Sequence, residues 1–218
     1  PPAGSGLGVH QLPLLLVLVL GLLSACESVP EKRPRSVPIG YDGELVLWWN
    51  DTVVKERGTY VNGERDGEIS VFYTDGVPHF AGQYEEGKPH GLLTTYHPNG
   101  AIATSETFSH GILDGTLSRF SSKTTQLVER TEFVNGLKQG METQWRENGR
   151  KAFEGYWTSG LPSGRWQHWD AIGRLARTEH YWIIAGMPTG YLETVYSSAG
   201  VASVQTLKRR IEDAWQGW

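Results

Sequence analysis

The chain is poor in cysteine and carries no excess of positive charge. Its single cysteine, Cys26, excludes an internal disulfide, so the stability of a folded domain must come from packing. The formal net charge of −4 offers no basic stripe for nucleic acid, and we expect no nucleic-acid partner. The chain is instead rich in glycine, tryptophan and tyrosine, with 27, 9 and 9 residues. This composition argues against disorder and predicts short strands joined by tight turns.

Asp, Glu, Lys and Arg are also missing from the first 25 residues. An apolar run extends from Leu12 to Leu23. It is shorter than the roughly 20 residues that a membrane-spanning helix needs, and it is typical of the apolar core of a signal peptide. The sequence begins at Pro1 and no positive residue precedes the run, so we expect a few further residues upstream. Residues 1–25 are therefore interpreted as a signal peptide.

Cys26 follows this run directly, in the sequence Leu23-Ser24-Ala25-Cys26. The pattern resembles the bacterial lipobox, which implies cleavage before Cys26, diacylglycerol on its sulfur and anchoring to a membrane. The alternative is an incidental cysteine in an uncleaved anchor. Glu27 resembles the outer-membrane address of Gram-negative lipoproteins, so the resemblance implies a lipoprotein of the cell envelope. Residues 26–40, which include three prolines, are predicted to form an extended tether.

An internal repeat of about 24 residues occupies the rest of the chain. Its marker is a pair of glycines four residues apart, which recurs at Gly63/Gly67, Gly87/Gly91, Gly111/Gly115, Gly136/Gly140, Gly160/Gly164 and Gly186/Gly190. One aromatic column stands seven positions before the second glycine, at Tyr60, Tyr84, Phe108, Phe133 and Trp157. Another stands five positions after it, at Phe72, Tyr96, Phe120, Trp145 and Trp169. We expect both columns to form the core.

Each repeat unit is predicted to be one β-hairpin. In the unit 68–91, two strand-like segments flank Asp75-Gly76, a pair that suits a type I′ turn. Asn99-Gly100 and Asn148-Gly149 occupy the same place in other units, whereas residues 123–125 are Lys-Thr-Thr and predict a looser turn. A lone hairpin cannot bury its apolar face, so the hairpins must stack side by side.

The pattern aromatic-x-x-Gly-x-x-x-Gly, followed by an aromatic and a hairpin glycine, resembles the MORN repeat and especially its bacterial antitoxin-like variant. The resemblance covers about Gly43 to Thr206 and implies a repeat array over residues 41–205. The expected fold class is all-β: an elongated antiparallel meander of β-hairpin repeats rather than a closed barrel. The resemblance does not imply an antitoxin role for this chain, since an exported lipoprotein is an odd place to neutralise a cytoplasmic toxin.

The carboxyl end, residues 206–218, departs from the repeat. Leu207, Ile211 and Ala214 fall at helical spacing on one face. We expect a short C-terminal helix that starts at Thr206 and caps the open edge of the last hairpin. The alternative is a helix that binds a partner.

No constellation of catalytic or metal-binding residues stands out in the sequence. Beyond Cys26 no cysteine remains for a zinc site, and no Gly-Lys-Ser/Thr follows a glycine pair. The histidines that follow Cys26 fall mostly in different repeat columns, and we expect exposed positions for all six: His79, His90, His97, His110, His168 and His180. We therefore predict no metal, no cofactor and no enzymatic activity.

Aromatic residues outside the two columns are candidates for binding. Neighbouring residues of a strand face opposite sides, so adjacent aromatics such as Trp48 and Trp49 expose one ring. The candidate binding surface consists of Trp49, Tyr73, Tyr156, Trp166 and Tyr191. We expect a protein-interaction or scaffold module with a protein partner, held at a membrane by lipid on Cys26. The alternative is a module that binds cell-wall glycans through these aromatics.

Overall fold

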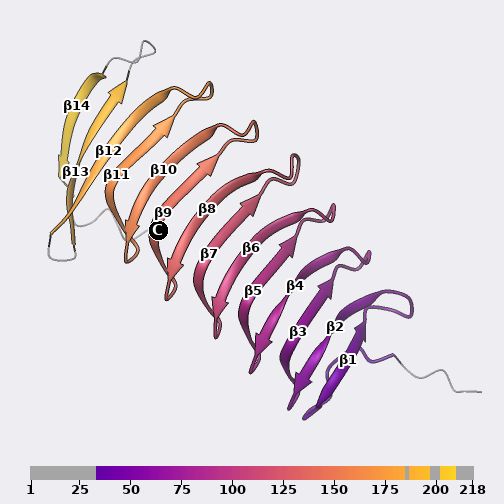
Figure 1. Cartoon of the computed structure of the whole chain (residues 1–218). Helices are drawn as coiled ribbons and strands as arrows, with labels where there is room; N and C mark the ends of the chain where they lie inside the picture. The colour runs from indigo at the N-terminus through magenta and orange to yellow at the C-terminus, as the bar shows by residue number, and fades with distance from the viewer. Residues whose placement is uncertain (1–32, 185–186, 197–201, 210–218) are drawn as a thin grey trace, which may run out of the picture. The chain divides into compact units, whose positions relative to one another are not determined.

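The computed structural model describes residues 33–184, 187–196 and 202–209. These residues form one antiparallel sheet of 14 strands, and each strand is hydrogen-bonded to its neighbours in the chain (Figure 1). The strands are β1 (Gly43–Trp48), β2 (Val54–Val61), β3 (Glu64–Phe72), β4 (Pro78–Glu85), β5 (Lys88–Tyr96), β6 (Ile102–Ser109), β7 (Ile112–Phe120), β8 (Leu127–Val134), β9 (Leu137–Trp145), β10 (Lys151–Thr158), β11 (Leu161–Trp169), β12 (Leu175–Ile184), β13 (Met187–Tyr196) and β14 (Ala202–Arg209). The predicted all-β antiparallel meander of hairpins is confirmed. Among these residues there is no helix that could span a membrane.

The predicted signal peptide (1–25) and Cys26 lie outside the described residues. Part of the predicted tether lies within them, and it contacts the first strand. The Trp48 N–H donates to the carbonyl of Pro34 at 2.9 Å, and the Arg33 guanidinium lies 4.1 Å from the centre of the Trp48 ring. Residues 33–40 therefore pack against β1 instead of standing free of the sheet, and they give this edge strand a backbone partner.

Two kinds of turn alternate along the sheet. In the turns that join one repeat to the next, both central residues have positive φ, for example 51° at Asn62 and 81° at Gly63. This is the type I′ geometry, whose twist matches that of the flanking strands. The same geometry recurs at Glu86-Gly87, His110-Gly111, Asn135-Gly136 and Ser159-Gly160. The first glycine of each sequence pair thus lies in a turn, and the second lies inside the following strand, as Gly67 does in β3.

The turns within the repeats differ from the type I′ geometry that we predicted for them. At Asp75-Gly76 only the glycine has positive φ. The Gly76 N–H donates to the Tyr73 carbonyl at 3.0 Å, and the Tyr73 N–H donates to the Val77 carbonyl at 2.8 Å. This pattern is a type I turn closed by a left-handed glycine, because the loop is longer than the two residues of a type I′ hairpin. Asn99-Gly100 and Asn148-Gly149 follow the same pattern.

The turn around residues 123–125 is looser, as predicted. Thr125 takes the left-handed conformation, with a φ of 59°, where the other repeats have glycine. Its N–H donates to the Ser121 carbonyl at 3.0 Å, and the Ser121 N–H donates to the Gln126 carbonyl at 2.9 Å. The loop is one residue longer than its counterparts, which explains why this repeat is one residue longer than the one before it in the sequence.

The buried core lies on one face of the sheet, which we call the core face. Strand alternation places Tyr60, Ile69 and Val71 on this face, and all three are buried. The other members of the Tyr60 column are half-buried, because within the described residues the sheet has no second layer to cover them. The opposite face, which carries Val61, Leu92 and Tyr156, is called the outer face.

The carboxyl end does not turn helical at Thr206, as we had predicted. Residues 206–209 belong to β14, where Thr206 pairs with Glu193 and Leu207 pairs with Leu192 of β13. Pairing with β14 satisfies the backbone groups of β13, which a helix at this position would leave without partners. The rest of the predicted helix, residues 210–218, lies outside the described residues.

Candidate binding faces

A ladder of side-chain hydrogen bonds connects the ends of adjacent hairpins. In four repeats, a side chain just after a strand bonds to the backbone carbonyl 23 residues later. The pairs are Trp49 Nε1 with Phe72 (2.9 Å), Tyr73 OH with Tyr96 (3.3 Å), His97 Nε2 with Phe120 (2.9 Å) and Arg146 Nη2 with Trp169 (2.8 Å). Two residues of the predicted binding surface, Trp49 and Tyr73, are therefore links between repeats, although Trp49 stays 39% exposed.

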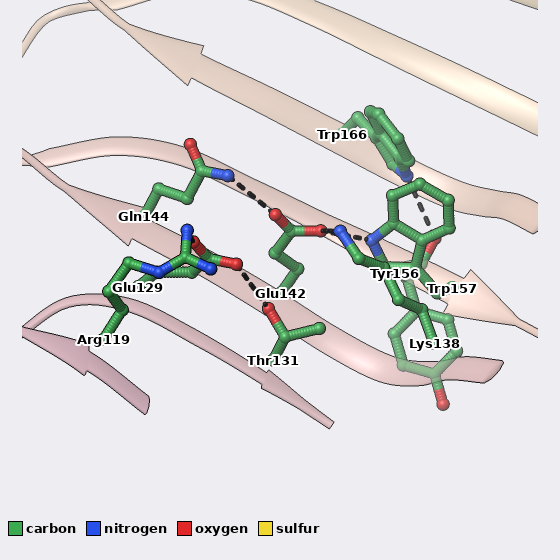
Figure 2. A network of polar contacts seen from close by, with 9 residues as sticks. All are labelled: Arg119, Glu129, Thr131, Lys138, Glu142, Gln144, Tyr156, Trp157 and Trp166. Carbon is green, nitrogen blue, oxygen red and sulfur yellow. Dashed lines mark hydrogen bonds and ion pairs between the residues drawn. The ribbon is translucent and has the colours of Figure 1, made fainter. Parts of the chain in front are cut away.

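The other three residues of the predicted binding surface do not lie together. Tyr156 is exposed on the outer face. Trp166 lies on the core face, where its Nε1 donates to the Tyr156 carbonyl at 3.0 Å (Figure 2). Tyr191 is in β13 opposite Tyr181, and its side chain lies outside the part of the structure that is described. The structure thus divides the predicted surface among the two faces and the hairpin ends.

Trp166 belongs to an aromatic cluster on the core face. Its ring centre lies 5.2 Å from that of Phe153, 5.0 Å from that of Trp157 and 4.8 Å from that of Tyr181. Phe153 meets Trp166 edge to face at 77°, and Trp157 and Tyr181 are tilted to it by 54° and 53°. Stacking on a sugar would need an open ring face, and these rings are turned toward one another. The cluster therefore gives no support to the glycan alternative.

Glu142 is the centre of a polar network on the same face. Its side chain is buried, and its carboxylate accepts hydrogen bonds from Lys138 Nζ (2.7 Å), Gln144 Nε2 (2.7 Å) and Trp157 Nε1 (2.8 Å) (Figure 2). A buried carboxylate needs such partners to offset the loss of water. Because its oxygens are engaged within the sheet, Glu142 is suited to holding β9 and β10 together and not to proton transfer.

A second carboxylate of this network, Glu129, lies one strand away. Arg119 Nη1 donates to it at 2.9 Å and Thr131 Oγ1 at 3.3 Å (Figure 2). Thr131 itself is 1% exposed, so its hydroxyl has to find a partner within the protein. Paired charges and hydrogen bonds thus form part of the core in these repeats.

Glu56 forms a similar network near the amino end of the sheet. Arg65 donates to it from Nε at 2.6 Å and from Nη2 at 2.8 Å, and the Tyr60 hydroxyl donates at 2.7 Å. Burial by itself would raise the pKa of Glu56. The hydrogen bonds from Arg65 and Tyr60, together with the charge of Arg65, outweigh burial and hold the pKa of Glu56 below its ordinary value. Burial and the neighbouring carboxylate raise the pKa of Tyr60.

Glu179 of β12 is the third buried carboxylate on the core face. The Tyr181 hydroxyl donates to it at 2.7 Å, Arg177 Nε lies 3.0 Å away and His168 Nε2 lies 3.7 Å away. Burial opposes ionisation, but the hydrogen bonds from His168 and Tyr181 and the charge of Arg177 lower the pKa of Glu179 below its ordinary value. Glu56 and Glu179 are therefore ionised at neutral pH and paired with groups of the sheet.

The outer face of β7 to β10 carries an exposed apolar patch. Ile112, Val134 and Leu137 flank consecutive type I′ turns and are 51%, 49% and 51% exposed. Met141 and Tyr156 are each 43% exposed and lie directly opposite each other in the register of β9 and β10. We call these five residues the apolar patch. Only Tyr156 of this set stands out in the sequence, as an aromatic residue outside the repeat columns; the aliphatic residues beside the turns carry no such signal.

The structure also brings together three residues that have no evident relation in the sequence: Glu85, His90 and His110. His110 Nε2 lies 3.2 Å from Glu85 Oε2, and His90 Nδ1 lies 3.6 Å from the same oxygen. The two imidazole ring centres are 4.6 Å apart. Both histidines were predicted to be exposed, and their side chains, like that of Glu85, reach solvent; that they lie next to each other was not predicted. A spacing of 20 residues, which brings a strand position next to the following turn, is the signal that was missed.

Neither the family models nor the curated proteins that we compared with this chain gave a match. The resemblance to MORN repeats therefore stays a prediction that rests on the spacing of glycines and aromatics.

Proposed function

We propose that this chain is a non-enzymatic protein-interaction module of the cell envelope, and that it binds its partner through the apolar patch. The observation that carries the proposal is the gathering of Ile112, Val134, Leu137, Met141 and Tyr156 on one face of four consecutive strands. Exposed apolar patches on a rigid surface are typical of protein-binding sites, and methionine and tyrosine are enriched in them.

The rest of the sheet supports a binding role over catalysis. The buried carboxylates with lowered pKa, Glu56 and Glu179, are engaged with partners in the sheet. Catalysis needs polar groups that converge on an open cavity with free lone pairs or protons. A meander presents flat faces, which suit a partner surface better than a small substrate.

Attachment to a membrane is part of the proposal. Lipid on Cys26 would hold the sheet near the envelope surface, with residues 27–32 as the remaining length of tether. Replacing Cys26 with alanine should then release the protein from the membrane fraction without unfolding the sheet. Sedimentation of envelopes followed by immunoblotting measures this, and retention of the Cys26→Ala variant in the membrane fraction would contradict the lipid anchor.

The binding face is tested by cross-linking and capture from intact envelopes, with the captured species identified by mass spectrometry. The informative variant replaces Leu137 and Met141 together with serine, which removes two exposed apolar side chains and leaves the backbone pairing of β9 intact. The matched control is Leu92→Ser, since Leu92 is 56% exposed on the outer face of β5, away from the patch.

The proposal expects one defined protein to be captured by the wild type and by Leu92→Ser, and to be lost with the double variant. Circular dichroism should show the same β-sheet signal for all three proteins. Undiminished capture by the double variant would refute the assignment of the patch. Recovery of cell-wall polysaccharide that free sugar displaces would move the function to glycan binding.

A further inference from the structure

We propose that Glu85, His90 and His110 bind a divalent transition-metal ion. The three residues come from neighbouring elements: Glu85 ends β4, His90 lies in β5, and His110 is the first central residue of the type I′ turn between β6 and β7. One ligand atom from each residue can be chosen so that all three lie within 4.8 Å of one another. The site lies at the turn edge of the sheet, and its ligand His110 is two residues from Ile112 of the apolar patch.

Two of the three ligand separations, those from Glu85 to the histidines, fit the first coordination shell of zinc. Zinc bonds of about 2.0–2.1 Å in a tetrahedron set neighbouring ligand atoms about 3.3 Å apart. The separations from Glu85 Oε2 to His110 Nε2 and to His90 Nδ1 are 3.2 Å and 3.6 Å, on either side of that value. The side chains are 51%, 63% and 45% exposed, so a metal ion can enter from solvent and water can complete the coordination.

The ring nitrogens of the cluster have protein partners that a metal ion can replace. His90 Nδ1 uses its single lone pair to accept the backbone N–H of His110 at 3.4 Å, a long bond that ligation would displace. Ser109 Oγ lies 3.3 Å from His110 Nδ1; in the tautomer in which it accepts the proton of that nitrogen, His110 Nε2 carries the lone pair that faces Glu85.

The requirements of the fold account for only part of this cluster. In other repeats the position of His90 is held by an acceptor that bonds the N–H of the turn residue 20 positions later, as Asp42 does with Asn62 at 2.6 Å and Gln139 with Ser159 at 2.8 Å. The bond from His110 to His90 is 3.4 Å long, as is the bond from Glu86 to Asp66 in the preceding repeat, so His90 fills this role as an aspartate does there.

The turn does not require a carboxylate at the position of Glu85. Its counterparts beside the other type I′ turns include Val61 and Val134. A repeat that needed only a sound turn would therefore require neither the carboxylate nor the two histidines. The three departures from the repeat occur together and at one place.

The ligand set indicates the class of metal. Two imidazoles and one carboxylate suit Zn²⁺, Ni²⁺ or Cu²⁺, whereas Ca²⁺ and Mg²⁺ prefer all-oxygen sites. A bound ion would connect two strands and a turn of adjacent repeats, so it would stabilise the folded sheet against unfolding. Binding through His90 Nδ1 displaces only the long bond from the His110 N–H.

The test is calorimetric titration of the purified full chain with Zn²⁺, in a Cys26→Ser background that removes the thiol as a competing ligand. Two variants use residues that the chain itself places at equivalent positions: His110→Asn, as in Asn62, and His90→Gln, as in Gln139. Both keep the turn geometry. The control is His79→Gln, which removes an exposed histidine outside the cluster.

The proposal expects one Zn²⁺ per chain, and a loss of affinity of more than tenfold in His110→Asn and in His90→Gln but not in His79→Gln. Zn²⁺ should also raise the Tm of the parent protein and leave the Tm of His110→Asn unchanged. Absence of stoichiometric binding, or equal affinity in all variants, would overturn it. Circular dichroism confirms that each variant is folded, so a lost signal reports the ligand and not the fold.

Discussion

The sharpest stability prediction concerns Glu56 and its partners. Replacing Glu56 with glutamine keeps the shape of the side chain but removes its charge. An amide nitrogen then stands in the place of Oε2. The amide oxygen can still accept from the Tyr60 hydroxyl and Arg65 Nε, which both use Oε1. The amide nitrogen would face Arg65 Nη2, so the bond of 2.8 Å at that point is lost and two donors meet.

The expected loss can be estimated from the burial of the pair. A hydrogen bond to a charged group contributes about 1.5–3 kcal/mol, and breaking a fully buried ion pair costs about 3–5 kcal/mol. The Glu56 side chain is 7% exposed, but that of Arg65 is 32% exposed and can recover some hydration. We therefore expect the free energy of unfolding to fall by about 2–4 kcal/mol at pH 7.

Urea denaturation followed by circular dichroism measures this change, and hydrogen exchange of the β2 and β3 amides locates it. The matched control is Glu147→Gln, which removes the charge from a pair with Lys123 whose side chains are 77% and 55% exposed. An exposed pair of this kind contributes about 0–1 kcal/mol. If Glu56→Gln costs no more than Glu147→Gln, the network around Glu56 does not stabilise the sheet and the reasoning is wrong.

The pH dependence gives a second test of the same residue. The folded pKa of Glu56 lies below its ordinary value of 4.5, so as the pH falls the unfolded chain binds the proton first. The stabilisation from Glu56 is therefore complete above pH 4.5 and is lost as the pH falls through the lowered folded pKa. The difference in stability between the wild type and Glu56→Gln should shrink over that range, and a constant difference would contradict the assigned ionisation.

Three further changes should alter stability in ways that equilibrium unfolding can measure. Trp49→Phe removes the bond from Nε1 to the Phe72 carbonyl and should cost about 1 kcal/mol; no change would show that the ladder between hairpins is not stabilising. Gly82→Ala would place a methyl group 2.9 Å from the Leu92 carbonyl oxygen of the neighbouring strand and should cost about 1–3 kcal/mol or more. Thr125→Gly should instead stabilise the protein by about 1 kcal/mol, because a threonine with a φ of 59° is strained; a destabilised variant would contradict that strain.

Much of the fold could be predicted from the sequence because the signal is periodic. The glycine pairs and aromatic columns mark each hairpin independently, and the structure confirms the meander. The turn types could not be assigned in the same way. Asp75-Gly76 and Asn62-Gly63 look equivalent in sequence, and only the number of residues between the closing hydrogen bonds distinguishes a type I turn from type I′. The start of the C-terminal helix at Thr206 was predicted wrongly, because the four-residue spacing of Leu207 and Ile211 also fits one face of a strand.

The candidate sites were harder to predict, since they depend on contacts between repeats. Trp49 is an exposed aromatic in the sequence, but its indole nitrogen reaches a carbonyl 23 residues away. His90 and His110 belong to different columns and meet because a strand position lies beside the next turn. Such neighbours can be found only after the register of adjacent hairpins is known, and a single bulge within a strand changes that register.

The order of strands has a mechanical consequence. The first and last strands of the described sheet, β1 and β14, lie at its two opposite edges. A force applied through the ends of the sheet would load these edge strands, and it would open their hydrogen bonds one after another instead of shearing many at once. Each hairpin would then be released in turn at low force and could pair again when the load falls. Such a sheet would act as a compliant spring and not as a rigid strut.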